Sequence, residues 1–235
     1  QILAECKGAD LVDIRYEQLL PFVLPYQNPE NAFRVISGDF VTTEDGTGIV
    51  HTAPTFGADD AKVAKEATPE VPPMLVLDEN GTPVPLVDLQ GKFTSHLGEY
   101  AGKYVKNEYY NDGEAPERSI DVELAIRLKE ENKAFKVEKY VHSYPHCWRT
   151  HTPIIYRATK QWLITVDDKY GKQNKTLREN ALNVVENLTF YPEWGRNRLK
   201  AMLDGRPDWC ISRQRDWGVP IAFFRNKKTD EIVFD

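Results

Sequence analysis

The chain has 235 residues and a mass of 27.0 kDa, which is enough for one large domain or two small ones. Hydrophobic residues make up 41% and charged residues 28%, and the 11% aromatic content with only 14 Gly and 15 Pro argues against a disordered chain or a fibrous repeat. The mean hydropathy is −0.54 and no apolar run is long enough to cross a bilayer, so we expect no membrane association. Three widely spaced cysteines do not resemble a disulfide framework, so a cytoplasmic location is expected.

The net charge of −6 is unevenly distributed along the sequence. Residues 196–225 hold seven basic and three acidic side chains, so this stretch is positive and the remainder is negative. A phosphate-bearing partner and an unevenly charged solvated surface both fit this pattern.

The first half of the sequence predicts short strands around one helix. Residues 33–41 and 48–51 read as neighbouring strands or a hairpin, and residues 58–67 read as a helix with two acidic residues in its first turn. Asn80-Gly81 between apolar runs predicts a second hairpin, formed by residues 74–77 and 84–87.

The second half predicts three further helices. Ser119 is a suitable N-cap for a helix that ends near Asn132. The remaining expectations are a strand over 135–141, strands at 154–156 and 162–164, helices over 167–187 and 195–204, and strand and loop over 209–224. A shift in composition between 145 and 165 predicts domains at 1–150 and 151–235. The chain begins without Met and ends after the apolar run 232–234, so we expect a piece of a longer protein.

Residues 46–60 hold the densest set of candidate functional groups. A strand ends at His51, a Pro/Gly loop follows, and a helix begins with Asp59 and Asp60. Carboxylates at a helix start are held ionised by the helix dipole and suit an ammonium group, while free loop amides suit an oxygen anion. The same residues are also typical of an ordinary helix start with a packed His. The stretch fits neither a dinucleotide-binding nor a P-loop pattern.

Four potential zinc ligands lie within ten residues: His142, His146, Cys147 and His151. The cluster has one Cys and no C-x-x-C pair, because Thr150 stands where the second Cys would fall. A hydrogen-bonded loop is therefore favoured over a metal site, and no metal ligand is assigned. A zinc-binding module and a non-catalytic RNA-binding module, the latter resting on the basic stretch, stay open as alternatives.

Two motifs resemble a known family. Residues 46–60, from Gly46-Thr47-Gly48 through His51-Thr52-Ala53-Pro54 to Asp60, resemble the editing-pocket motif of isoleucyl-tRNA synthetases. Residues 208–221, with Ser212-Arg213-Gln214-Arg215 and Trp217-Gly218, resemble a second signature of these class I enzymes. Residues 144–149 and 152–157 lie between the two motifs and also resemble the family, so the likeness covers most of the chain.

The resemblance implies an α+β fold with a barrel-like β core and flanking helices. Residues 1–150 would be part of an editing domain and 151–235 the return into the catalytic domain. The parent enzyme would join isoleucine to tRNA(Ile) with ATP and Mg, whereas this piece needs no cofactor. Its editing pocket would hydrolyse mischarged Val-tRNA, because an apolar synthetic site cannot strongly reject a missing methylene, a limit for which this family is the standard example. A monomer is expected.

The resemblance also implies roles for individual residues. Asp60 would hold the α-ammonium of the substrate and His51 would exclude isoleucine, with water as the attacking group. Ala53 and Phe56 would line the pocket edge, and Gly57 would allow close approach of the backbone. Trp217 would lie beside the synthetic amino-acid pocket; an ordinary buried aromatic is the alternative.

The sequence also departs from the family. The threonine-rich editing peptide is absent, since Thr42-Thr43 follows the wrong strand, and so are both ATP-handling signatures. This piece is therefore not expected to form an adenylate by itself.

Overall fold

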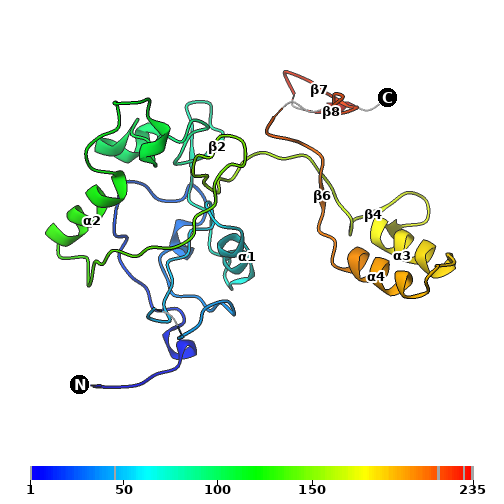
Figure 1. Cartoon of the computed structure of the whole chain (residues 1–235), viewed down its shortest axis with the longest axis horizontal. Coiled ribbons are helices and arrows are strands. Elements are labelled where there is room, and N and C mark those ends of the chain that lie inside the picture. Colours follow the sequence, from blue (N-terminus) through cyan, green and yellow to red (C-terminus); the bar gives the residue numbers. More distant parts are fainter. Residues whose placement is uncertain (1, 45, 216–217, 230, 234–235) are drawn as a thin grey trace. The chain divides into compact units, whose positions relative to one another are not determined.

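The computed structural model describes residues 2–44, 46–215, 218–229 and 231–233, and divides the chain into two compact units, Gln1–Ala158 and Thr159–Asp235 (Figure 1). The first unit contains the helices α1 (Ala58–Glu66) and α2 (Ile120–Glu130) and the strands β1 (Leu75–Leu77) and β2 (Pro83–Pro85). Short 3-10 turns complete it: η1 (Gly8–Leu11), η2 (Pro29–Asn31), η3 (Ser95–Tyr100) and η4 (Asn107–Tyr109).

Helix α1 confirms the prediction for residues 58–67 to within one residue. Gly57 is its extended N-cap, and Asp59 and Asp60 lie in its first turn. Lys65 lies in its last turn, so charges of both signs complement the helix dipole. Ala64 is almost fully buried, and its small side chain lets the rest of the unit approach the helix.

The β1–β2 hairpin confirms the second predicted hairpin. The strands are antiparallel, and Val76 faces Val84. The Asp78 carboxylate accepts hydrogen bonds from the amides of Asn80 (2.9 Å) and Thr82 (2.8 Å), and Gly81 has the positive φ of 74° that the turn requires. Helix α2 confirms the second predicted helix, with Ser119 as its N-cap.

The first prediction, a hairpin or neighbouring strands over 33–41 and 48–51, is wrong, because neither stretch forms a strand. Residues 33–35 pair instead with the N-terminal segment. The Tyr16 amide donates a hydrogen bond to the Phe33 carbonyl (3.0 Å), and the Val35 amide donates one to the Ile14 carbonyl (2.9 Å). Arg15 and Arg34 form one isolated antiparallel bridge there. The partner is distant in sequence, which a reading of neighbouring segments does not reveal. The predicted strand at 135–141 also lacks strand structure, because its residues have no ladder partner among the described residues.

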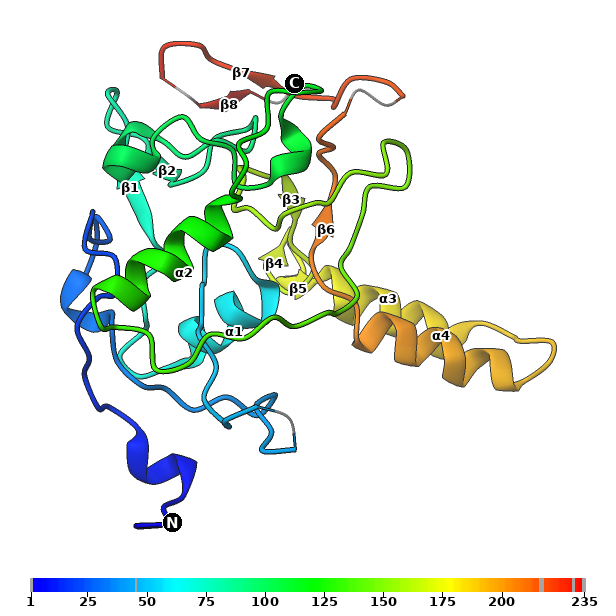
Figure 2. The same cartoon turned by 60° about the vertical axis from the view of Figure 1, so that its left-hand side comes forward.

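The second unit is built around the helices α3 (Leu177–Asn187) and α4 (Trp194–Asp204), which pack side by side (Figure 2). Both confirm predicted helices, and Gly205 follows α4 as expected. The expected start of α3 at 167 is wrong, because β4 (Lys169–Tyr170) and β5 (Lys175–Thr176) precede it as a tight hairpin. Gly171 and Asn174 both have positive φ and form that turn.

Short strands complete the second unit. β3 (Leu163–Ile164) pairs with β6 (Trp209–Cys210), and β7 (Phe224–Arg225) pairs with β8 (Ile232–Val233). The predicted strand at 154–156 is not formed. Each sheet of the described residues has two strands, and none closes into a barrel. The architecture is therefore a mixture of helices and small sheets. In the described part of the chain, every helix is too short or too polar to span a bilayer.

Candidate functional site

The loop that precedes α1 is held at two points. The Phe56 amide donates to the Ala53 carbonyl (2.9 Å), which closes a turn, and the Thr55 carbonyl accepts a hydrogen bond from the Ala158 amide (3.0 Å). Thr55 is only 3% exposed, so the loop packs onto the first unit rather than standing free of it. The turn therefore fixes the backbone immediately before the N-terminus of α1.

Asp60 folds back over the start of its own helix. A Cβ atom built on Gly57 would lie 2.1 Å from Oδ2 of Asp60, so the carboxylate occupies the space above the glycine. Asp60 is half-buried, whereas Asp59 is exposed. The two adjacent carboxylates are thereby distinguished: Asp60 lies against the positive end of the helix dipole, and Asp59 faces solvent.

The other predicted pocket residues lie in the same loop. Ala53, Phe56 and Gly57 are half-buried, and His51 is exposed in the segment without helix or strand that enters the loop. The structure thus places these residues along one turn and one helix start. A shared cavity for His51 and Asp60 stays a prediction.

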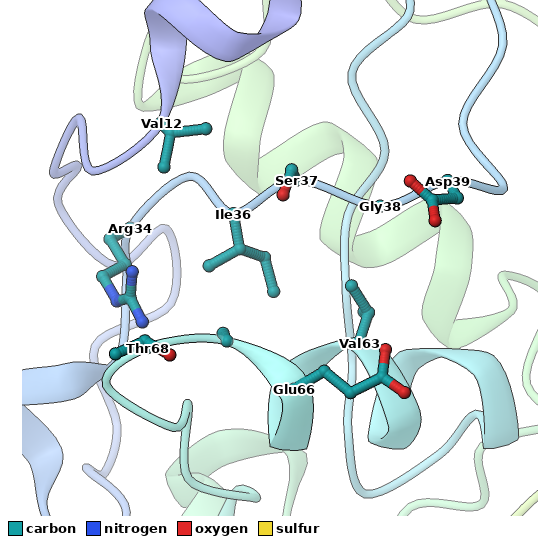
Figure 3. Close-up of a pocket in the computed structure, with 10 residues that line it drawn as sticks. Val12, Arg34, Ile36, Ser37, Gly38, Asp39, Val63, Glu66 and Thr68 are labelled. Carbon is teal, nitrogen blue, oxygen red and sulfur yellow. The ribbon is translucent and has the colours of Figure 1, made fainter.

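A cavity of about 200 Å³ lies on the other half of α1, where Val63, Glu66 and Thr68 meet the segment of Ile36 and Asp39 (Figure 3). Neither His51 nor Asp60 lines it. The sequence-predicted site and this cavity therefore share a helix but not a surface.

Arg34 is the buried charge of this cavity, with a side chain 3% exposed. Its guanidinium donates to Asp13 (2.5 Å), to the Asn31 carbonyl (3.2 Å) and to the Pro69 carbonyl. All three of its nitrogens are therefore engaged in joining the N-terminal segment, η2 and the residues after α1, which makes Arg34 a structural residue. Sequence reasoning missed this role, although a lone Arg in the apolar run 33–36 was the available signal.

Thr55 is a second residue that sequence reasoning missed. Its hydroxyl is buried and has no hydrogen-bond partner among the described residues. Such a group costs about 1–3 kcal/mol. The sequence gives no signal for it, because a Thr in a loop normally reaches solvent.

An open charged groove of about 520 Å³ lies between η3 and α2. Lys103 pairs with Glu123 (2.6 Å), and this hydrogen bond raises the pKa of Lys103. Arg127 forms ion pairs with Glu99 and Glu131. The pKa of Glu131 is lowered by hydrogen bonds, of which the one from Lys133 has the larger effect and the one from Arg127 the smaller. The charges of the groove largely satisfy one another, as in a structural surface network.

The cluster of potential zinc ligands forms a tight loop. The Cys147 amide donates to the Thr152 carbonyl and the His151 amide to the Cys147 carbonyl, both at 2.8 Å. Nδ1 of His142 and Nδ1 of His146 contact backbone carbonyls of Ser143 (2.9 Å) and Tyr144 (2.8 Å). Among the described residues, no group of three or more His, Cys, Asp or Glu side chains is placed to hold a metal ion.

The second signature begins in β6. Ser212 accepts a hydrogen bond from the Trp162 amide (2.9 Å) and donates to Gln161 (2.5 Å), which extends the β3–β6 pairing. Arg213 donates to the carbonyls of Cys210 (2.8 Å) and Ser212 (2.9 Å), so its guanidinium lies against its own strand end. Trp217, the predicted neighbour of the synthetic pocket, lies outside the described residues.

Comparison with known proteins agrees with the two motifs. The family "tRNA synthetases class I (I, L, M and V)" matches residues 13–235, and the chain belongs to this family. Within it, the chain is similar to isoleucine–tRNA ligases. The protein of that name from Aliarcobacter butzleri is 54% identical over 88% of the chain, and those from Cytophaga hutchinsonii and Bacteroides fragilis are 46% and 41% identical over 98%.

These relatives are much longer than the chain, which spans about a fifth of their length, 21% in each case. The match confirms the resemblance to isoleucyl-tRNA synthetases.

Proposed function

We propose that the chain is part of an isoleucine–tRNA ligase and forms most of the pocket that hydrolyses mischarged Val-tRNA. The arrangement of Asp60 above Gly57 carries the proposal. A carboxylate held over a glycine at a helix start presents its negative charge to a small cation, and the α-ammonium of an esterified amino acid is such a cation.

The neighbouring residues suit the rest of such a substrate. His51 enters the loop as the size gate that admits valine and excludes isoleucine, and Ala53 and Phe56 supply apolar surface beside it. Water is the attacking group, oriented by loop amides and by a ribose hydroxyl of the terminal adenosine. Missing parts of the pocket, including the threonine-rich peptide and the remainder of a barrel-like core, come from other segments of the parent protein.

The parent protein joins isoleucine to tRNA(Ile) with ATP and Mg in its catalytic domain. Residues 151–235 are the segment that leads back into this domain, and Trp217 lies beside its amino-acid pocket. It acts as a cytoplasmic monomer. The chain contains neither ATP-handling signature, so adenylate formation belongs to segments outside it.

Asp60→Ala in the full-length synthetase tests the proposal. Removing a charge-assisted hydrogen bond costs about 1.5–3 kcal/mol, so hydrolysis of Val-tRNA should fall about tenfold to a hundredfold. Isoleucine charging should stay unchanged, because it takes place at another site. Release of valine from Val-tRNA and the charging rate are measured in parallel.

Asp59→Asn is the matched control, since it removes the adjacent exposed carboxylate. It should leave hydrolysis at the original rate. Equal losses in both variants, or full activity in Asp60→Ala, would remove Asp60 from the site.

A further inference from the structure

Four aromatic side chains form a continuous row on the segment that follows α2. Tyr140, His142, Tyr144 and His146 alternate along the chain, and the distances between successive ring centroids are 5.8, 6.1 and 6.2 Å. The first pair is stacked, with an interplanar angle of 18°, and the next two meet edge to face. We call these four residues the aromatic row.

The row follows from an extended backbone, in which every second side chain points to the same side. Residues 136–145 form no helix or strand, and the segment runs as an extended trace after α2 (Figure 2). Because a carbonyl oxygen only accepts, Nδ1 of His142 and Nδ1 of His146 each carry a hydrogen toward the backbone. These bonds fix the orientation of both imidazole rings.

One end of the row is anchored to the first unit. The ammonium of Lys106 lies 4.8 Å from the centre of the Tyr144 ring. The Tyr109 hydroxyl donates to the Pro153 carbonyl (2.8 Å), and the Ile154 amide donates to the Pro145 carbonyl (3.1 Å). The Tyr144 end is therefore preorganised, and less conformational freedom is lost when a ligand binds there.

The rings are accessible to a partner. Tyr140 is 79% exposed and Tyr144 38%, and both His side chains are exposed. An apolar partner would bury phenol and imidazole groups without hydrogen bonds, which is unfavourable. A nucleobase offers a flat face for stacking and a polar edge for these groups, so it matches the alternation of Tyr and His.

Ring packing and charge favour the same ligand. Because successive rings already contact one another, a base stacks on the outer face of Tyr140, at the exposed end of the row, rather than between two rings. Lys136, Lys139 and Arg149 lie on the segment with Glu138 as its one carboxylate, and Arg149 covers the exposed Trp148 ring at 4.5 Å. The segment thus combines aromatic faces with net positive charge.

We propose that the aromatic row binds unpaired nucleotides of single-stranded RNA by stacking. The inference rests on the proposed function in that the RNA is the unpaired 3′ end of tRNA. Duplex RNA is a poor ligand, since its bases are already stacked on one another and their faces are covered.

Fluorescence anisotropy of the full 235-residue chain with a labelled oligomer of about eight adenosines tests the proposal. Tyr140→Ala should weaken binding about tenfold, because it removes the exposed stacking face. Tyr144→Ala should also weaken binding, because it removes the ring that anchors the row beside Lys106. Tyr140→Phe keeps the ring and should bind like the unaltered chain. Val141→Ala, which changes an 85% exposed side chain between two members of the row, should also have no effect.

The same adenosine oligomer paired with its complement should bind more weakly than the single strand. Equal affinity for the duplex, unchanged binding in both Tyr→Ala variants, or an equal loss in Val141→Ala would each overturn the proposal. Because Tyr140 is largely exposed, Tyr140→Ala should keep its circular dichroism spectrum. If Tyr144→Ala misfolds, the comparison of Tyr140→Ala with Tyr140→Phe still decides the result.

The proposals for the aromatic row and for the editing pocket can be rejected independently of each other. In the full-length synthetase, Tyr140→Ala should raise the KM for Val-tRNA hydrolysis with kcat unchanged, whereas Asp60→Ala should leave oligomer affinity unchanged. Hydrolysis that persists in Asp60→Ala while Tyr140→Ala loses oligomer binding would reject the pocket alone. The reverse outcome would reject the row alone.

Discussion

At the residue scale, the start of α1 depends on a glycine as much as on a carboxylate. Gly57 has φ of −146°, which any residue can adopt, so backbone freedom does not explain its presence. What requires glycine is the position of Asp60, whose carboxylate occupies the volume of the missing Cβ. The position of the Asp60 carboxylate therefore depends on both Asp60 and Gly57, three residues earlier.

Gly57→Ala should therefore displace the Asp60 carboxylate. Its Cβ would lie 2.1 Å from Oδ2, so the Asp60 side chain must turn toward solvent. We expect Val-tRNA hydrolysis in the full-length protein to fall about tenfold, while the helical circular dichroism signal of the chain stays intact. Gly8→Ala is the control, because a Cβ there meets no atom within 4 Å. Undiminished hydrolysis in Gly57→Ala would argue against a role for the carboxylate position.

At the element scale, the α3–α4 hairpin is closed by reciprocal arginine caps. Arg196 of α4 donates to the carbonyls of Val185, Glu186 and Leu188 at the end of α3. Arg178 of α3 donates to the carbonyls of Leu203, Asp204 and Arg206 at the end of α4. Each helix thereby satisfies the free C-terminal carbonyls of the other, which explains how two short helices stay paired.

The cap that Arg178 forms at the end of α4 should be sensitive to acid. Arg178 also donates to both carboxylate oxygens of Asp167, at 2.7 and 2.8 Å, and this hydrogen bonding lowers the pKa of Asp167 from its ordinary value of 3.8. Because the pKa of Asp167 is lower in the folded state, its ion pair with Arg178 stabilises the fold above pH 3.8. This stabilisation is lost as the pH falls through the lowered pKa.

Urea unfolding of the chain and of Asp167→Asn measures this effect. The variant should be less stable at pH 7, and the difference should shrink as the pH is lowered below 4, because the carboxylate becomes neutral in both states. Asp168→Asn, which alters an exposed neighbour, should show neither effect. A stability difference that does not depend on pH would contradict the assigned ion pair.

At the scale of the whole molecule, the first unit has a small core. Its buried apolar residues are Ala32, Ala64, Val76, Val87, Tyr100 and Ile120. Long-range polar contacts supplement this core, and Arg34 joins its neighbour η2 to two segments distant in sequence, those of Asp13 and Pro69.

Arg34→Met should consequently destabilise the first unit. Removing the guanidinium leaves two carbonyls and the Asp13 carboxylate without this partner, and because Asp13 is 66% exposed the expected cost is about 1–3 kcal/mol. Arg34→Lys should recover little of this loss, because an ammonium cannot replace the planar fork. Arg15→Lys, at an exposed neighbour, serves as the control. Thermal unfolding measures all three variants, and a melting temperature unchanged in Arg34→Met would refute the argument.

The sequence alone determined the family, the presence of the helices and one hairpin. Helices with acidic first turns, the Asn-Gly hairpin and the two synthetase motifs were readable because neighbours in sequence specify them. Tertiary structure decided the rest: the partner of residues 33–35, the buried Arg34, the Asp60 carboxylate over Gly57 and the exchange of arginine caps. Each of these depends on segments brought together by folding or on the direction of a side chain, and neither is fixed by local propensity.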